Sequence, residues 1–127
     1  MLLITLPSFG QEIGCASRGI HSIKLLKSNN LFSFVYSDIN SQPHDKENSF
    51  NFHNKETVFK MIMDGFSSIT DHQMIVLTTN DTIIKFEFRK IKGKKMLKIK
   101  QNNLQSKTFG TSTFFTKNEI VQLFGNP

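Results

Sequence analysis

The sequence predicts an α+β fold in which two β-β-β-β-α repeats pack as one domain with curved antiparallel sheets. Two observations favour this fold. Apolar residues alternate with polar ones in several short segments, which is the period of a half-buried strand. In each half of the chain, the last of these segments follows a polar loop and leads into a helix with its own capping residue. A single β-barrel with a C-terminal helix is the alternative architecture.

The length and composition of the chain favour one folded domain. It has 127 residues, of which 38% are hydrophobic and 20% charged, and these fractions exclude a disordered tail protein. A repeat of about 60 residues would bury too little apolar surface to fold alone, so the two repeats are expected to share a core. We place the domain at residues 23–127, with repeats at about 23–66 and 73–127, and expect residues 1–22 to form an N-terminal arm or a first strand.

Three of the strands of the first repeat can be assigned to segments of the sequence. The first lies somewhere within residues 20–27, and the second is residues 31–37 (LFSFVYS), where aromatic side chains alternate. Residues 38–48 carry almost no apolar side chains and predict a loop. Residues 49–52 predict a short strand before the helix.

The second repeat has the same order of segments. Residues 73–79 and 82–91 predict two strands, and a Lys-Gly-Lys turn leads to a third at residues 96–100. Residues 101–107 predict a polar loop, and residues 113–115 a short fourth strand.

Capping residues predict where both helices begin. Asn54 precedes a helix expected to run to about Asp64 and to stop at Gly65. Thr116 and Glu119 have the spacing of a capping box before a short C-terminal helix. At an offset of 63 residues the two strand-to-helix junctions coincide in four pairs: Ser49 and Ser112, Phe52 and Phe115, Glu56 and Glu119, and Val58 and Val121.

The charge of the chain favours an anionic partner. Sixteen basic residues against ten acidic ones give a formal charge of +6, and residues 64–127 carry +5 of it. Fourteen of the basic residues are Lys, which occur with 13 Ile, 13 Phe and 11 Asn, so AT-rich codons are an alternative origin of the lysines. Only two arginines are present, and arginine is the residue that reads guanine in duplex DNA, so backbone contacts are favoured over sequence readout.

The lysines concentrate on the hairpin of residues 82–100. Strand alternation turns Ile84, Phe86, Phe88, Leu97 and Ile99 inward and Lys85, Glu87, Arg89, Met96, Lys98 and Lys100 outward. Aromatic rings beside cations are typical of single-strand binding, and the candidate rings are Phe32, Phe34, Tyr36 and Phe109, with Tyr36 preferred because its hydroxyl tolerates solvent. The predicted nucleic-acid-binding residues are Lys85, Arg89, Lys92, Lys94, Lys95, Lys98, Lys100 and Tyr36. Lysines that only protect a sheet edge from aggregation are the alternative interpretation.

A resemblance to known families supports the same function. The segment from Phe86 to Lys100, with its Lys-Gly-Lys turn, followed by Thr113 to Glu119, resembles the strand, turn, strand, short strand and helix of the positive cofactor four coactivator family. Duplicated β-β-β-β-α units are also similar to the Whirly and PUR-domain proteins. The resemblance implies binding of single-stranded DNA or RNA on curved sheets.

The sequence does not indicate catalysis, a metal site or a cofactor. The four histidines at positions 21, 44, 53 and 72 have no metal-ligand spacing, and the glycines at positions 10, 14 and 19 form no phosphate-binding loop. The acidic loop with Asp38, His44, Asp45 and Glu47 could chelate a hard cation, but a solvated loop explains it equally. We therefore expect a protein that is not an enzyme.

The single cysteine and the apolar segments bear on location. Because Cys15 has no partner for an intramolecular disulfide, a reducing intracellular compartment is expected, which fits a nucleus, an organelle, a bacterial cytoplasm or a virus-infected cell. The apolar run at residues 1–6 lacks a basic leader, which disfavours a secretory signal and leaves an organellar transit peptide open. No segment has the length of a membrane span.

Together these observations predict a non-enzymatic protein that binds single-stranded DNA or RNA. A homodimer or higher oligomer is compatible with the fold. The alternative is a small protein-interaction or inhibitor module of a phage, a virus or a bacterium that docks an acidic protein surface.

Overall fold

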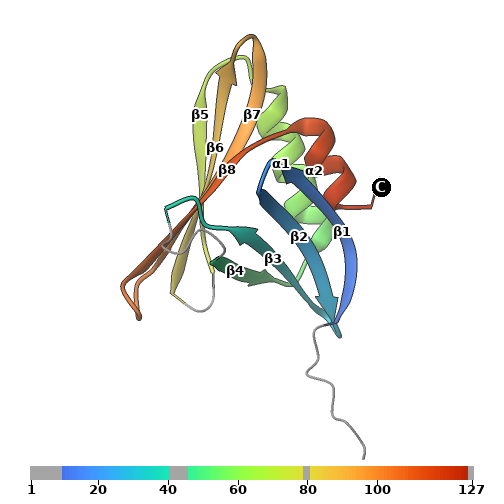
Figure 1. The fold of residues 1–127 in the computed structure, drawn as a ribbon, viewed down its shortest axis with the longest axis vertical. Coiled ribbons are helices and arrows are strands. Elements are labelled where there is room, and N and C mark those ends of the chain that lie inside the picture. The colour runs from blue at the N-terminus through green and yellow to red at the C-terminus, as the bar shows by residue number, and fades with distance from the viewer. Residues whose placement is uncertain (1–9, 41–45, 79–80, 126–127) are drawn as a thin grey trace, which may run out of the picture.

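The computed structural model describes residues 10–40, 46–78 and 81–125 (Figure 1). Eight strands and two helices lie within these residues. The first repeat holds β1 (Gln11–Arg18), β2 (His21–Ser28), β3 (Leu31–Ser37), β4 (Glu47–Phe52) and α1 (Lys55–Ser67). The second holds β5 (His72–Leu77), β6 (Thr82–Ile91), β7 (Lys94–Asn103), β8 (Thr108–Thr116) and α2 (Lys117–Leu123).

The strands form two antiparallel sheets, and the predicted α+β fold is confirmed. Each sheet has four strands in sequence order, β1-β2-β3-β4 and β5-β6-β7-β8. Within the described residues neither sheet closes on itself, so the alternative of a single β-barrel is wrong. Neither helix is long and apolar enough to cross a membrane.

Each helix packs on the sheet of the other repeat. Helix α1 contacts β6 and β7 of the second sheet. Helix α2 contacts β1 and β2 of the first sheet, as well as β7 and β8 of its own, so the two repeats are intertwined (Figure 1). Glycines permit both approaches. A Cβ at Gly65 of α1 would lie 2.2 Å from the Phe88 ring, and one at Gly14 of β1 would lie 2.4 Å from the Leu123 carbonyl oxygen.

The exchanged helices enclose one hydrophobic core between the two sheets. Its aromatic centre joins elements that are far apart in the sequence: Phe34 of β3 lies 5.2 Å from Phe50 and 5.6 Å from Phe124, measured between ring centroids. Phe50 in turn lies 6.4 Å from Phe86 of the second sheet. Because both repeats contribute rings to this core, neither repeat can bury its apolar face without the other.

Both predicted helix starts are confirmed, while one predicted end is wrong. Asn54 accepts a hydrogen bond from the Thr57 backbone N–H, and Thr116 and Glu119 form a complete capping box. Helix α1 continues through Gly65 to Ser67. Gly65 allows the Phe88 ring to pack closely against the helix and does not end it. The sequence pattern does not show this tertiary contact.

The strands also depart from the predictions at the chain start and in the polar loop. Strand β1 lies within residues 1–22, where a first strand was one of the two expectations; the strand expected within residues 20–27 is β2, and the first repeat therefore begins before residue 23. Three of the seven residues of the predicted loop 101–107 belong to a strand, because β7 runs to Asn103, and β8 begins at Thr108, five residues before the predicted strand 113–115. The inward polar residues there are bonded: the Ser112 hydroxyl, for example, accepts from the Ile99 N–H at 2.9 Å. Polar side chains therefore do not exclude a strand where partners satisfy them.

Candidate nucleic-acid interface

The outward side of the second sheet carries rows of residues that cross its four strands. The first row is Leu77, Ile83, Asn102 and Phe109, the second is Ile75, Lys85, Lys100 and Thr111, and the third is Gln73, Glu87, Lys98 and Phe114. Successive rows lie about 7 Å apart, because two strand residues separate them. We call these residues, together with Arg89 and Lys94 beyond the third row, the basic face.

Glu87 organises two of the cations on this face. Its carboxylate is buried and accepts from Arg89 Nε at 3.0 Å, from Lys100 Nζ at 3.2 Å and from Gln73 Nε2 at 3.4 Å. Arg89 and Lys100 are thereby held in fixed positions at some cost in net charge. The carboxylate is the sole acid among the residues that make up the face.

Three further lysines of the basic face form no ion pair within the described part of the chain. They are Lys85, Lys94 and Lys98. Lys98 Nζ lies 4.5 Å from the centroid of the Phe114 ring, a cation–π contact that places a charge beside an aromatic surface. These three ammonium groups are available to an anionic ligand.

The structure brings most of the predicted cations together. Lys85, Arg89, Lys98 and Lys100 share the basic face, Lys94 lies at its end, and Lys92 is in the turn. Lys95 is an exception, because it pairs with Lys90 on the opposite side and its Nζ donates to the Thr70 carbonyl at 2.8 Å. Lys95 was expected near the turn, and it lies on the side of the sheet opposite the basic face because position 95 has the same strand parity as the inward residues 97 and 99.

Tyr36 is fully buried, so its predicted role as a stacking surface is wrong. Its hydroxyl donates to Gln101 Oε1 at 2.7 Å, and Gln101 Nε2 donates to the Ser49 carbonyl at 2.9 Å. Burial, and secondarily the nearby Asp38 carboxylate, raise the pKa of the Tyr36 hydroxyl. Tyr36 therefore links the two sheets. Of the other candidate rings, Phe34 is buried, Phe32 is half-buried, and Phe109 is 71% exposed.

Replacing Tyr36 with phenylalanine is expected to lower the free energy of unfolding by about 1–3 kcal/mol, because Gln101 Oε1 loses its donor in a buried site. The difference from wild type should shrink above about pH 10. There the unfolded tyrosine ionises while the buried one stays protonated, so the wild type alone loses stability through this group. Urea unfolding at neutral pH and at about pH 11 measures both effects.

The same Tyr36→Phe variant tests the placement of the ring. Affinity for oligonucleotides should stay unchanged, since the hydroxyl lies in the core. A loss of affinity with unchanged stability would contradict the buried position and return the residue to the surface.

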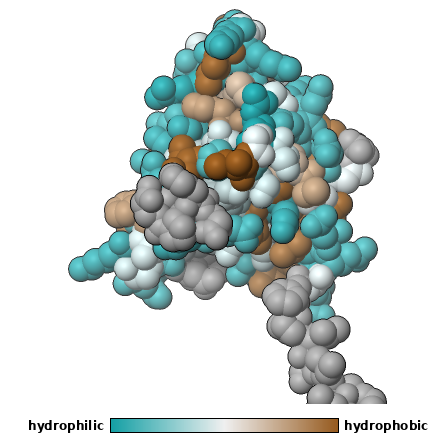
Figure 2. Space-filling model, in the orientation of Figure 1, coloured by the Kyte–Doolittle hydropathy of each residue, from teal (hydrophilic) through white to brown (hydrophobic). Residues whose placement is uncertain are grey.

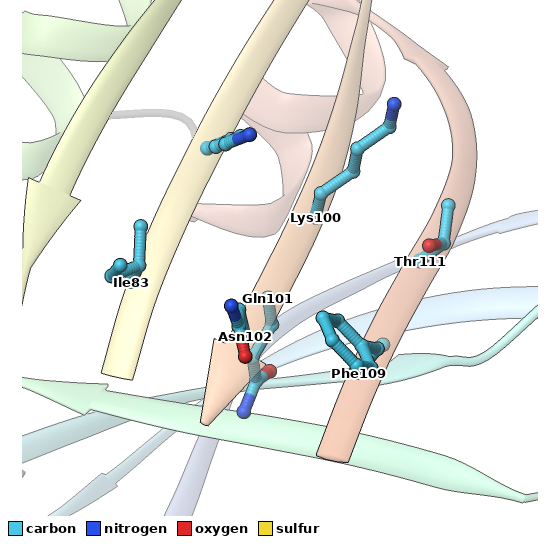
Figure 3. Close-up of a pocket in the computed structure, with 8 residues that line it drawn as sticks. Ile83, Lys100, Gln101, Asn102, Phe109 and Thr111 are labelled. Carbon is cyan, nitrogen blue, oxygen red and sulfur yellow. The ribbon is translucent and has the colours of Figure 1, made fainter. Parts of the chain in front are cut away.

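A hollow of about 230 Å³ opens on the basic face where the first two rows meet. It is lined by Ile83, Lys85, Lys100, Gln101, Asn102, Phe109, Gly110 and Thr111 (Figure 3). Ile83, Asn102 and Phe109 lie abreast on β6, β7 and β8, and Lys100 extends away from them along the sheet (Figure 3). Ile83 and Asn102 were not predicted, because strand alternation gives their side but not their cross-strand neighbours.

Polar contacts from the first repeat hold the hollow from behind. Asp38 is buried, and its carboxylate accepts from the Thr111 N–H at 3.3 Å and from Asn48 Nδ2 at 2.8 Å. The Ile39 N–H donates to the Thr111 carbonyl at 2.8 Å. Asp38 therefore acts as a structural link to β8.

The candidate cation-chelating loop receives no support from the described residues. No group of three His, Cys, Asp or Glu side chains lies together among them. His44 and Asp45 of that loop lie outside the described residues.

Comparison with protein-family models, with curated proteins and with solved structures finds no match for this chain. Figure 2 shows hydrophobic side chains interspersed with hydrophilic ones on the visible side of the molecule. On the basic face, Ile75 and Leu77 are 64% and 65% exposed beside the lysines. Such a surface offers both charge and apolar contact to a ligand.

Proposed function

We propose that the protein is a non-enzymatic module that binds single-stranded DNA or RNA on the basic face. The observation that carries the proposal is the adjacency of the first two rows: a row with three apolar side chains, ending in exposed Phe109, lies directly beside a row with Lys85 and Lys100. Single-strand-binding proteins combine a cationic path for phosphates with rings on which bases stack. The resemblance to the positive cofactor four, Whirly and PUR-domain proteins supports the same ligand.

The face also has features that favour a single strand over a duplex. A duplex keeps its bases stacked and presents phosphates and groove edges, for which exposed Phe109, Ile75 and Leu77 offer little. An unpaired strand exposes the base faces that can cover these side chains. Arg89, the one arginine on the face, is held by Glu87, which further disfavours base readout in a groove.

Fluorescence polarisation of labelled oligonucleotides over a series of salt concentrations tests the proposal. Binding to a single strand is expected to weaken with a slope of about −0.7 in log affinity against log salt for each phosphate contacted. A duplex of the same sequence should bind more weakly. Absence of binding at low salt, or tighter binding to the duplex, would overturn the proposal.

A protein-interaction module is the second candidate, because the same exposed Ile75, Leu77 and Phe109 would suit an acidic protein with apolar contacts. Nuclease treatment during affinity purification separates the two functions. A nucleic-acid ligand is lost on treatment, whereas a directly bound protein is retained.

A further inference from the structure

We infer that the hollow between Ile83, Asn102 and Phe109 accepts one unstacked nucleobase, with the phosphates of the same strand on Lys85 and Lys100. This inference rests on the proposed function and names a base-binding subsite within it. Three properties of the hollow carry the inference: its apolar side walls, a free amide between them, and cations on one side only.

The walls suit the faces of a base. Phe109 is 71% exposed, and a large apolar ring so open to water gains the most from being covered. Ile83 stands on the other side, with one intervening strand, since both residues pair with Asn102 in the ladder. Bases taken out of a stack are bound in other proteins between aromatic and apolar side chains in this way.

The amide of Asn102 lies between the two walls. It makes no hydrogen bond with the described residues, whereas the neighbouring Asn103 accepts from the Gln105 and Ser106 N–H groups. An asparagine amide presents an acceptor oxygen beside a donor nitrogen, and the edges of nucleobases present adjacent donors and acceptors. A base between the walls would therefore meet a hydrogen-bonding partner at their centre.

The cations of the second row define where the backbone runs. Lys85 and Lys100 lie about 7 Å from the first row along the strands, and no lysine or arginine belongs to the first row itself. Lys100 points away from Asn102 and Phe109 (Figure 3). This separation matches a nucleotide whose base and phosphate bind different rows.

The floor of the hollow is held in place by hydrogen bonds before any ligand binds. Gln101 is fixed by Tyr36 and the Ser49 carbonyl, and Thr111 is fixed by Asp38. Because these partners belong to the first repeat, β7 and β8 cannot shift independently of it. The subsite is therefore organised in advance, which reduces the entropic cost of binding.

The test compares a single-stranded oligonucleotide with a strand of equal length made of abasic sites, so that only the bases differ. The measured quantity is the dissociation constant for the abasic strand divided by that for the strand with bases. The wild type is expected to bind the strand with bases more tightly. Phe109→Ala should reduce the ratio by about 5- to 100-fold, the range for loss of one base–aromatic stack. Asn102→Leu, which keeps the branched shape of the side chain and removes the amide, should reduce it by about 2- to 10-fold.

Neither variant should change binding to the abasic strand, since the lysines remain. Ile20→Ala is the matched control, because Ile20 is 79% exposed in the turn between β1 and β2, outside the second sheet. Two results would overturn the subsite and leave the proposed function standing. One is equal wild-type affinity for the two strands, and the other is an equal loss of affinity for both strands in Phe109→Ala. No wild-type binding to either strand at low salt would overturn the proposed function and the subsite with it.

Discussion

Replacing Phe34 with alanine is expected to lower the free energy of unfolding by about 3–5 kcal/mol, the range for truncating a fully buried phenylalanine. The cost should lie in the upper part of this range because several elements surround the ring. Its centroid lies 5.1 Å from that of Phe52 and 5.6 Å from that of Phe124, which follows the exchanged helix α2. Relaxation of one element cannot fill the cavity without disturbing the others.

Urea unfolding followed by circular dichroism measures the loss, with Phe109→Ala as the control. Phe109 is the same residue type but 71% exposed, so its truncation should change the free energy of unfolding by less than about 0.5 kcal/mol. Both proteins should unfold in one transition, since the repeats share their core. A Phe34→Ala loss below about 1 kcal/mol, or separate transitions for the two sheets, would contradict the shared core.

The parts of the fold that could be predicted are those with strong local signals. Strand β6 has the predicted bounds because its inward residues alternate without interruption from Ile84 to Phe88. Asn54 and Thr116 mark the helix starts because capping depends on residues only three apart. Strand β1 gave no such signal, since Ala16 is its one buried residue.

The packing of each helix on the sheet of the other repeat could not be predicted from local sequence patterns. It depends on Gly14 and Gly65 at contacts between segments far apart in the chain. Such contacts are fixed by tertiary packing, and a glycine in the sequence is equally typical of a turn or a helix end.

The candidate site could be predicted only in part, for a related reason. Alternation alone places Lys85 and Lys98 on one side of a sheet, and the structure agrees. The same rule places Tyr36 with inward Phe34, so its burial was available from the pattern, but the preference for a solvent-tolerant hydroxyl led to the wrong side. The row of Ile83, Asn102 and Phe109 needs the register of three strands, and alternation does not determine register.

Reversing the charge of Lys85, Lys94 and Lys98 together, by substitution with glutamate, is expected to weaken single-strand binding by about 100-fold or more at 0.1 M salt. Each phosphate contact contributes about a factor of five there through counterion release, and the new carboxylates add repulsion. These three lysines have no ion pair within the described residues, so their reversal removes no ion pair of Glu87. Because position 98 lies directly across from Glu87 and position 85 across from Lys100, urea unfolding of the variant must show that the fold is retained. Fluorescence polarisation should also show a salt slope shallower by about two.

The matched control reverses Lys24, Lys27 and Lys46 of the first repeat. Each variant exchanges three lysines for glutamates, which takes the formal charge of both from +6 to zero. Long-range attraction from net charge is therefore reduced equally in the two proteins, and only the location of the change differs. If the basic face binds the strand, the control retains most of its affinity and its salt slope. Equal losses in both variants would mean that the strand is attracted by total charge without a defined path, and the assignment of the ligand to the basic face would then be wrong.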